Sequence, residues 1–409
     1  MKVLRFNQDA SCFSIICGPH SMAIYNCDPF GRCFELENST SNSSSGNGGE
    51  NGKAHEDHMG NFVTEMLFAT SLIAVVNKNQ GLQKAKKLRI VNTKRKSTIC
   101  ELNFPHEIVD VVMNRKRMCV LLSSEQIFVY DISCMKLLHT INVLEDKLKM
   151  SGSFHNHSSS VQQSHPVQRS RTNMVRIALS SDDKSILCYT AYCKSVKHSY
   201  LLNDLVIYDA LNVVPLNYLN TVHKGNIACL CISNDGKLVA TASEKGTIIR
   251  MFSTGDETAF NSNTALMYEF RRGTRPCSIH EMKIDRTGRY LACVGHTDTI
   301  HIFDLEKYGQ GYRGFDDYTA PSMLGVKSAK ANTRQIANFL SKRVISKISN
   351  HNMERDFAHI KVQDSIRHCI GFPNEFPERI YVASSNGEFH VWNIPQHGGE
   401  CILVKSNKF

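Results

Sequence analysis

Short apolar runs recur along the chain at even spacing, and polar turns separate them. Residues 226–252 contain three such runs, "NIACLCIS", "LVATAS" and "TIIRMF", joined by "NDGK" and "EKG". Apolar runs of this length that flank Asn-Asp-Gly or Glu-Lys-Gly are typical of β-strands connected by tight hairpin turns. The pattern therefore predicts consecutive antiparallel strands rather than helices.

The same order of runs returns in six other parts of the chain. These are residues 2–26, 63–93, 107–132, 174–209, 279–303 and 366–394. Several copies contain an apolar-aromatic motif such as "VYDI", "IFDL" or "VWNI". A repeat of about 40–45 residues with about four strands per unit is typical of a β-propeller.

We therefore predict an all-β fold in which residues 1–409 form a single seven-bladed β-propeller. The Trp-Asp and Gly-His motifs of WD40 repeats are mostly missing from this sequence, so the propeller is expected to be a divergent WD40 type. A pair of unrelated β-sandwiches is the alternative interpretation of the same strands.

Three long insertions interrupt the repeat. Residues 38–60 and 150–172 are rich in Ser, Asn, Gly and His, and we expect both to be disordered loops. Residues 306–356, within the sixth unit, are basic and place Ala337, Leu340, Val344 and Ile348 on one face of a helix. This long basic amphipathic loop is expected to be partly helical and to meet a membrane surface. A helix packed on the propeller rim is the alternative.

Composition narrows the class of partner. The formal net charge is +10 and the pI is near 8.9, which favours anionic partners such as membrane phosphates or acidic protein faces. The 15 cysteines include no C-x-x-C pair, as expected of reduced, mostly buried thiols in a cytosolic protein without a metal site. The longest apolar stretch, "MLFATSLIAVV", is shorter than the ~20 residues of a membrane span.

The segment "YEFRRGTRP", residues 268–276, carries two adjacent arginines at the end of an apolar strand. Because side chains alternate along a strand, Arg271 and Arg272 are expected to leave it on opposite sides. Hydroxyl, imidazole and basic side chains occur on both sides of this strand in sequence, and together they suit a phosphate group. Arginines that only bridge neighbouring blades are the alternative.

"FRRGT" on the last strand of the fifth unit resembles the motif of the PROPPIN (WIPI) family of phosphoinositide-binding propellers. The resemblance covers the whole chain, including "FNQDASCF", "HKGNIACLCISNDGKLVATASEKGTIIRMF" and "GFPNEFPERIYVASSNGEFHVW". "CDPFGRCFE" and "IVNTKRKSTICELNFPHEIVDVVMNRKRMCVLL" are similar to the fungal branch that serves the cytoplasm-to-vacuole targeting pathway.

The resemblance implies two sites for phosphatidylinositol 3-phosphate and phosphatidylinositol 3,5-bisphosphate. Site 1 would comprise His223, Ser243, Lys245, Thr247, Arg250 and Arg271. Site 2 would comprise Arg272, Arg275, His296, Thr297, Thr299 and His301. Membrane insertion would fall to Phe339, Leu340, Val344 and Ile345. The family pattern at the second site is often Ser-Asp-Lys-Gly-Thr, whereas this chain has Gly295-His296-Thr297-Asp298-Thr299, which lacks the lysine and adds an acidic residue.

"MNRKRM", residues 113–118, places Arg115, Lys116 and Arg117 at a turn between two predicted strands. A solvated hairpin tip is one interpretation, and a basic knob for an acidic helix is the other. The resemblance implies recruitment of the coiled-coil scaffold of the autophagy conjugation complex, together with its ubiquitin-like protein, at the groove between blades two and three.

Other classes of function find less support in the residues. The chain has no nucleophile elbow, P-loop or metal-ligand spacing, so we expect neither an enzyme nor a cofactor. It also lacks the basic platform with interleaved aromatic residues that single-stranded nucleic acid requires. The resemblance implies a cytoplasmic protein, peripheral on the phagophore assembly site and on endosome and vacuole membranes. A protein-only propeller scaffold remains the rival function.

Overall fold

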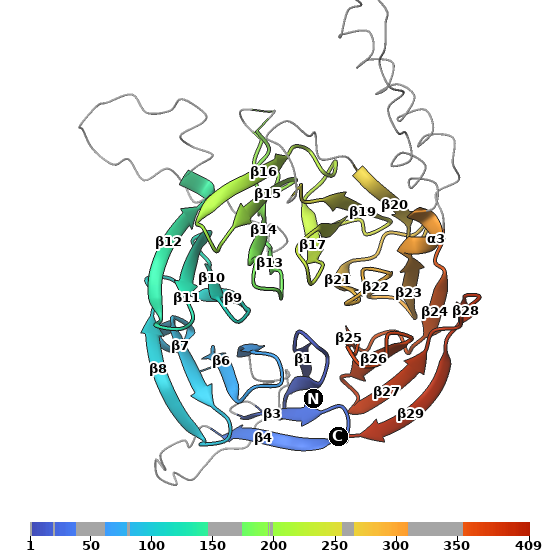
Figure 1. The fold of residues 1–409 in the computed structure, drawn as a ribbon, viewed down its shortest axis with the longest axis horizontal. Helices are drawn as coiled ribbons and strands as arrows, with labels where there is room; N and C mark the ends of the chain where they lie inside the picture. Colours follow the sequence, from blue (N-terminus) through green and yellow to red (C-terminus); the bar gives the residue numbers. More distant parts are fainter. Residues whose placement is uncertain are drawn as a thin grey trace, which may run out of the picture.

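The chain forms seven β-sheets arranged as blades around a central axis (Figure 1). The computed structural model describes residues 2–18, 21–37, 62–79, 82–145, 174–194, 196, 199–255, 266–309 and 355–409. Each blade is built from four strands that follow one another in sequence, except that the short strand β28, which lies between β27 and β29 of blade 7 in sequence, joins blade 6. Every described pair within a blade is antiparallel except β24 with β28. The prediction of a seven-bladed propeller is confirmed.

The first four blades are regular four-stranded units. Blade 1 contains β1 (Lys2–Phe6), β2 (Cys12–Ile16), β3 (Ser21–Asn26) and β4 (Gly31–Glu37). Blade 2 contains β5 (Phe62–Met66), β6 (Leu72–Asn77), β7 (Lys87–Asn92) and β8 (Ser97–Asn103), with α1 (Leu82–Ala85) between β6 and β7. Blade 3 contains β9 (Ile108–Met113), β10 (Arg117–Leu122), β11 (Gln126–Asp131) and β12 (Lys136–Asn142). Blade 4 contains β13 (Ile177–Leu179), β14 (Ile186–Ala191), β15 (Asp204–Asp209) and β16 (Val214–Leu219).

The last three blades complete the ring. Blade 5 contains β17 (Ile227–Ile232), β18 (Leu238–Ser243), β19 (Ile248–Ser253) and β20 (Leu266–Arg271). Blade 6 contains β21 (Ile279–Ile284), β22 (Tyr290–Gly295), β23 (Thr299–Asp304) and β24 (Ala358–Lys361), with α3 (Leu305–Gly309) after β23 and β28 (Gly399–Glu400) beside β24. Blade 7 contains β25 (His368–Gly371), β26 (Arg379–Ser384), β27 (Glu388–Asn393) and β29 (Ile402–Lys408).

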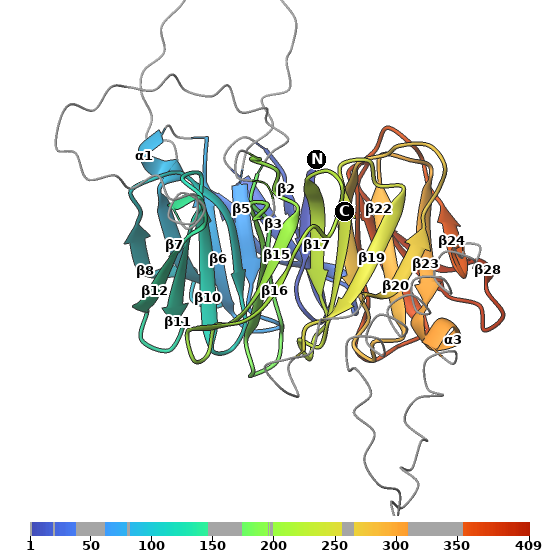
Figure 2. The same ribbon diagram turned by 90° about the horizontal axis from the view of Figure 1, so that it is seen from above.

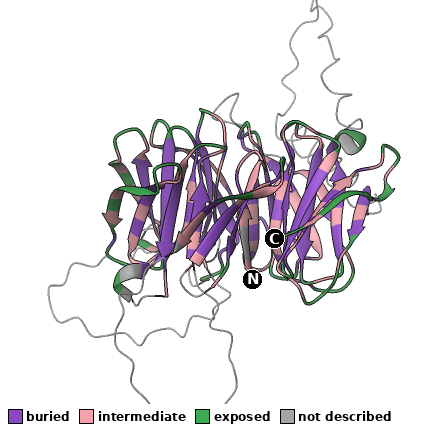
Figure 3. Ribbon diagram, turned by 90° about the horizontal axis from the view of Figure 1, so that it is seen from below, coloured by how far each residue is buried: buried purple, intermediate pink, exposed green. Residues whose placement is uncertain are grey.

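Burial falls from the middle of each blade to its outer edge (Figure 3). Every residue of β10, β14 and β22 is buried, because both faces of a blade pack against neighbouring blades. The outer strands β8, β16 and β29 are mostly exposed or half-buried, since each has only one strand beside it. Continuous apolar runs therefore mark the second and third strands of a blade, and the outer strands read as mixed sequence.

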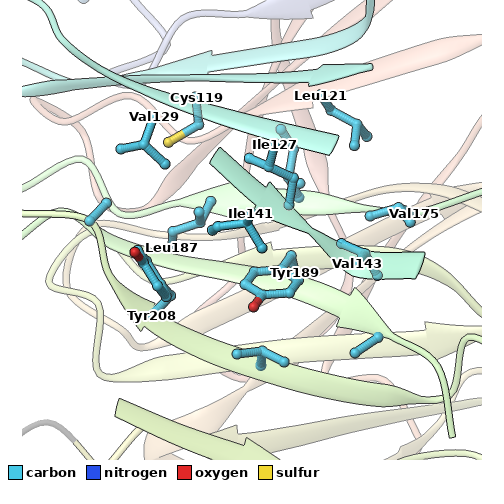
Figure 4. Close-up of a cluster of buried hydrophobic side chains, with 14 of the residues drawn as sticks. Cys119, Leu121, Ile127, Val129, Ile141, Val143, Val175, Leu187, Tyr189 and Tyr208 are labelled. Carbon is cyan, nitrogen blue, oxygen red and sulfur yellow. The ribbon is translucent and has the colours of Figure 1, made fainter. Parts of the chain in front are cut away.

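A separate hydrophobic cluster fills each of the seven interfaces between blades. Figure 4 shows the cluster between blades 3 and 4, where Leu121 and Val129 meet Leu187 and Tyr189. These contacts remove apolar surface from water on both sides of every sheet, at about 25 cal/mol per Å². The core is thus a ring of interfaces rather than one central mass.

Side chains close the ring between blades 1 and 7. Phe13 of β2 stacks on Phe389 of β27 with ring centroids 5.4 Å apart, and Phe409 packs on the edge of Phe13 at 5.1 Å. The strands of blade 7 come from the carboxyl-terminal part of the chain and those of blade 1 from the amino-terminal part, so no strand is exchanged between these two described sheets. Aromatic packing and not a shared strand joins the two ends of the chain.

Each blade has four consecutive antiparallel strands, so the chain leaves a blade at the face where it entered, and the inner strands begin at one face of the ring, which we call the entry face. Figure 2 views the ring from its edge, with the two faces at the top and bottom. Because neighbouring strands are antiparallel, the second strand of each blade returns to this face and the third strand starts from it. The connection between β23 and β24 lies at the opposite face for the same reason. This connection joins β23 to β24, and both strands belong to blade 6.

The predicted loops lie almost wholly outside the described residues. This applies to 38–60, to 150–172 and to 310–354 within the third insertion. The described part of the third insertion comprises α3 on one side and Arg355 and Asp356 on the other. No helix in the described part of the chain is long and apolar enough to cross a membrane.

Candidate functional site

Strand β20 presents different chemistry on its two sides. Phe270 is buried and its ring lies 4.7 Å from that of Phe303 in blade 6. Glu269 faces the other way and contacts Arg250 of β19 at 3.4 Å. The amide of Arg272 donates to the carbonyl of Thr247, so the strand pairing continues one residue past β20. Alternation then requires Arg272 to leave on the side of blade 6 and Arg271 on the side of blade 4.

Among the site 1 residues, Arg250 and His223 meet on the blade 4 side. Arg250 donates from Nη1 to the carbonyl of Val222 at 2.7 Å, which brings its guanidinium next to His223. The imidazole of His223 is 4% exposed, and its Nε2 lies 3.0 Å from Oγ1 of Thr241. Burial and the charge of Arg250 lower the pKa of His223 to about 4, so the ring is neutral at pH 7.

Glu269 is a member of this site that the sequence did not suggest. It lies on the same side of β20 as Arg271 and forms an ion pair with Arg250. One carboxylate therefore offsets part of the positive charge next to Arg271. The sequence could have indicated Glu269, because residues two apart in a strand, such as 269 and 271, point to the same side.

The turn between β18 and β19 carries Lys245 of site 1 and is held in place by backbone hydrogen bonds. The amide of Gly246 donates to the carbonyl of Ser243, and the carbonyl of Lys245 accepts from the amide of Cys277. Gly246 has φ +56°, and a Cβ there would lie 1.9 Å from the carbonyl oxygen of Cys277. Only glycine fits this close approach of two backbones. Lys245 is exposed, whereas Ser243 and Thr247 are half-buried.

Arg272 has a structural use in addition to any ligand. Its Nε donates to the carbonyl of Gly246 at 2.6 Å, and its Nη2 donates to the carbonyl of Arg275. The residue is 8% exposed. Arg272 thus joins the β18–β19 turn to the linker between blades 5 and 6, while Arg275 itself is exposed on that linker. The bridging alternative therefore describes part of what this arginine does.

The blade 6 residues of site 2, His296, Thr297, Thr299 and His301, lie on β23 and on the turn between β22 and β23. Oγ1 of Thr299 donates to Asp298 at 2.9 Å and accepts from Nζ of Lys361 at 3.1 Å. Oγ1 of Thr297 donates to the carbonyl of Thr299 at 3.3 Å. The missing lysine of the family pattern therefore has a counterpart from another strand, since β24 pairs Lys361 directly opposite Thr299.

Two histidines of site 2 have different surroundings. Nδ1 of His301 lies 2.8 Å from a carboxylate oxygen of Asp356. Burial alone would raise the pKa of Asp356, but the hydrogen bond from His301 and the charges of His301 and His359 lower it. His296 is exposed and packs edge-on against His280, with ring centroids 5.3 Å apart. Within the described residues, no group of three or more His, Cys, Asp and Glu could hold a metal ion.

The basic turn of blade 3 divides into exposed and buried parts. Arg115 and Lys116 are exposed, and the guanidinium of Arg115 lies 4.1 Å from the ring centre of Phe68 in blade 2. Arg117 is buried and donates to the carbonyls of Ala210 and Leu211 in blade 4. Arg117 therefore joins blade 3 to blade 4, and only Arg115 and Lys116 face solvent at the boundary of blades 2 and 3.

The four residues expected to insert into a membrane lie outside the described residues. They are Phe339, Leu340, Val344 and Ile345.

The ring fold and the basic, hydroxyl-rich edge at blades 5 and 6 define a β-propeller with a candidate anion-binding edge. The PROPPIN family model matches residues 43–409. The chain belongs to the PROPPIN family.

Relatives cover the full length of the chain. The Autophagy-related protein 21 of Eremothecium gossypii is 72% identical to it over 100% of both proteins, and that of Saccharomyces cerevisiae S288c is 46% identical over 100% of both. Among solved structures, the "Complex of KlAtg21 with coiled-coil of AgAtg16" matches with a TM-score of 0.74 and 44% identity, covering 100% of this chain and 99% of that one. Kluyveromyces lactis Hsv2p matches with a TM-score of 0.60 and 18% identity over 100% and 99%, which shows the fold alone.

Replacing Arg272 by Thr is expected to destabilise the protein more than replacing Arg271 by Thr. The first change removes two hydrogen bonds from a buried charged donor to backbone carbonyls, a loss of about 2 kcal/mol or more. Urea unfolding of both variants measures the difference in the free energy of unfolding. Arg272→Lys should also be destabilised, because an ammonium cannot reach both carbonyls in the same geometry. Equal stability of Arg271→Thr and Arg272→Thr would contradict this role.

Stability is expected to fall as the pH drops from about 6.5 to about 4. His223 and His280 both have pKa values lowered to about 4, mainly by burial, so the folded protein leaves them neutral where the unfolded chain binds protons. Each contributes a slope of up to about 1.4 kcal/mol per pH unit in that range. Urea unfolding at several pH values should show a shallower slope for His223→Gln than for the exposed control His106→Gln. Equal slopes would rule out His223 as a source of the effect.

Proposed function

We propose that the chain is a phosphoinositide-binding membrane adaptor in autophagy and cytoplasm-to-vacuole targeting. It binds phosphatidylinositol 3-phosphate and phosphatidylinositol 3,5-bisphosphate through site 1 and site 2. The observation that carries this proposal is the backbone pairing of β20 through Arg272, because strand alternation then directs the adjacent Arg271 and Arg272 to opposite sides. Membership of the PROPPIN family supports the same function.

In site 1, Arg271 and Lys245 provide the positive charge that meets the phosphate. Arg250 is already paired with Glu269 and bonded to a backbone carbonyl, so it orients the wall behind the ligand. The neutral imidazole of His223 lies in that wall. The exposed ammonium of Lys245 and the half-buried hydroxyls of Ser243 and Thr247 supply donors of the kind that phosphate oxygens accept.

In site 2, the exposed cations are Arg275 and Lys361. The ammonium of Lys361 already donates to the hydroxyl of Thr299, so the two groups lie side by side and would contact the same phosphate group. Asp298 and Asp356 lie close by and reduce the net positive charge there. We therefore assign the weaker headgroup affinity to site 2.

The two sites act together on one membrane. Each pocket alone binds its headgroup weakly, and two pockets on the same rigid propeller gain from effective concentration when they address one surface. The basic amphipathic sequence of the third insertion adds a third contact in this proposal, from the sixth blade. These contacts would hold the protein at the phagophore assembly site and on endosome and vacuole membranes.

Arg115 and Lys116 form the proposed contact for an acidic coiled coil. They are exposed at the boundary of blades 2 and 3, and Phe68 holds the guanidinium of Arg115 in place by a cation–π contact. A relative of 44% identity was solved with a coiled coil of AgAtg16, which supports a coiled-coil scaffold of the conjugation machinery as the partner class. Recruitment of the ubiquitin-like protein of that machinery is part of the same proposal.

A protein-only scaffold is the competing function, and lipid binding separates the two. Arg271→Thr combined with Arg272→Thr should abolish flotation with liposomes that contain phosphatidylinositol 3-phosphate, because site 1 loses the charge of Arg271 and site 2 loses the arginine that holds the backbone of Arg275 in place. Wild-type protein should float with these liposomes and not with liposomes that lack the lipid. Flotation that does not depend on the lipid would favour the scaffold.

A matched control separates lost ligand contacts from lost charge. Lys94→Thr combined with Arg95→Thr removes two adjacent exposed cations from a turn of blade 2 and should leave flotation unchanged. Because Arg272 also stabilises the fold, Arg271→Thr alone should be tested with it, at a temperature where each variant is folded by circular dichroism. Equal loss of flotation in the control pair would mean that net charge, and not the two sites, determines binding.

Arg115→Asp is expected to weaken binding of the AgAtg16 coiled coil by about tenfold or more, because it replaces attraction to acidic residues by repulsion. Isothermal titration calorimetry with the purified coiled coil measures the change. Flotation with phosphatidylinositol 3-phosphate should stay at the wild-type level. Lys136→Asp on the outer strand of blade 3 is the charge-matched control, and a loss of binding there would contradict a local contact at Arg115.

A further inference from the structure

The seven inner strands enclose a central cavity of about 490 Å³. Residues from all seven blades line it, among them seven Lys or Arg side chains and three carboxylates. The cations are Lys2, Arg5, Lys78, Arg176, Lys283, Arg286 and Arg367, and the carboxylates are Glu65, Asp110 and Glu281. The cavity is therefore positively charged overall, and its charge is separate from the edge of blades 5 and 6.

The carboxylates lie in the middle of the cavity, where they are already used. Arg5 forms ion pairs with Glu65 and Asp110, both at 2.7 Å, and so joins blades 1, 2 and 3. In blade 6, Glu281 lies 3.9 Å from Lys283 and accepts from the amide of Ile370. No carboxylate among these three remains to balance the cations at the end of the cavity.

Four of the cations surround the opening at the entry face, which we call the entry mouth. Lys2 begins β1, while Arg176 and Arg367 directly precede β13 and β25, so all three lie where inner strands start. Lys78 directly follows β6, which returns to the same face. The entry mouth thus receives cations from blades 1, 2, 4 and 7.

Three of these four cations have no anionic partner among the described residues. Lys78 pairs with Glu107 at 3.0 Å, whereas Lys2, Arg176 and Arg367 form no ion pair with any other described residue. Burial and then the positive charges of Arg367 and Lys78 lower the pKa of Lys2, which indicates that these groups lie close together. Like charges held together at a cavity opening cost free energy unless an anion joins them.

One buried donor at this opening also lacks a hydrogen-bond partner among the described residues. It is Nε of Arg176, which lines the cavity. A buried donor without a partner is unfavourable, and a ligand that accepts from it recovers that free energy.

We propose that the entry mouth binds a soluble multivalent phosphate anion of the inositol polyphosphate or inorganic polyphosphate class. Guanidinium and ammonium groups from four blades surround the opening, so a ligand with several phosphates is matched better than a monovalent anion. Such a ligand would join blades 1, 2, 4 and 7 across the axis. The proposal does not depend on lipid binding at sites 1 and 2, which lie at the edge of blades 5 and 6.

Isothermal titration calorimetry with inositol hexakisphosphate on the full chain tests this proposal, at near-physiological ionic strength so that weak surface binding is screened. Wild-type protein should bind the probe saturably and should unfold at a higher temperature in its presence. Arg176→Gln combined with Arg367→Gln should weaken binding by about tenfold or more, because two charge-assisted contacts are lost. Inorganic tripolyphosphate in a second arm tells whether phosphate charge alone is recognised or whether the inositol ring contributes.

Two controls make the result specific. Arg286→Gln changes a cavity cation in the turn between β21 and β22, at the opposite face, and should bind like the wild type. Arg271→Thr disables site 1 and should also bind like the wild type. Arg367→Lys keeps the positive charge and should retain binding, so that weaker binding in the Gln variants can be attributed to lost charge and not to unfolding. Absence of saturable binding to the wild type, equal loss in Arg286→Gln, or loss only in Arg271→Thr would overturn the proposal.

Discussion

The packing of both faces of every blade against its neighbours is the constraint on which the rest of the structure depends. A sheet whose middle strands are apolar on both faces cannot leave those faces exposed to water, so each blade must pack against a neighbouring blade on each face. Seven interfaces satisfy this requirement only if the last blade meets the first. The aromatic cluster of Phe13, Phe389 and Phe409 provides that contact, and the two ends of the chain therefore stabilise the same interface.

The candidate phosphate sites arise from the same need to join blades. Arg272 is held by two backbone carbonyls at the junction of blades 5 and 6, and Gly246 allows the turn of one blade to approach the linker of the next. Because Arg272 holds this junction together, it also helps to fix the positions of the side chains on both sides of β20. Stability and ligand geometry are consequently coupled at this position, and a variant of Arg272 changes both.

Carboxylates decide how much of the positive charge is available for a ligand. Glu269 offsets Arg250, Asp356 holds His301, and Glu65 with Asp110 balances Arg5 in the central cavity. The exposed cations Lys245, Arg275 and Lys361 remain, together with Lys2, Arg176 and Arg367 of the entry mouth, which form no ion pair with any described residue. The net charge of +10 is thus less informative than the places where acidic partners are lacking.

The repeat of apolar runs was sufficient to predict seven blades, because burial on both faces demands apolar sequence in the second and third strands of each blade. Opposite sides for Arg271 and Arg272 followed from strand alternation, which is a local property. The contact of Lys361 with Thr299 could not be predicted from the sequence, since a long insertion separates β23 from β24. Arg117 looked exposed in sequence, yet its carbonyl acceptor at Ala210 is 93 residues away. Local periodicity thus determined the strands, whereas contacts between distant segments, which depend on closure of the ring, decided which charges are buried, paired or available.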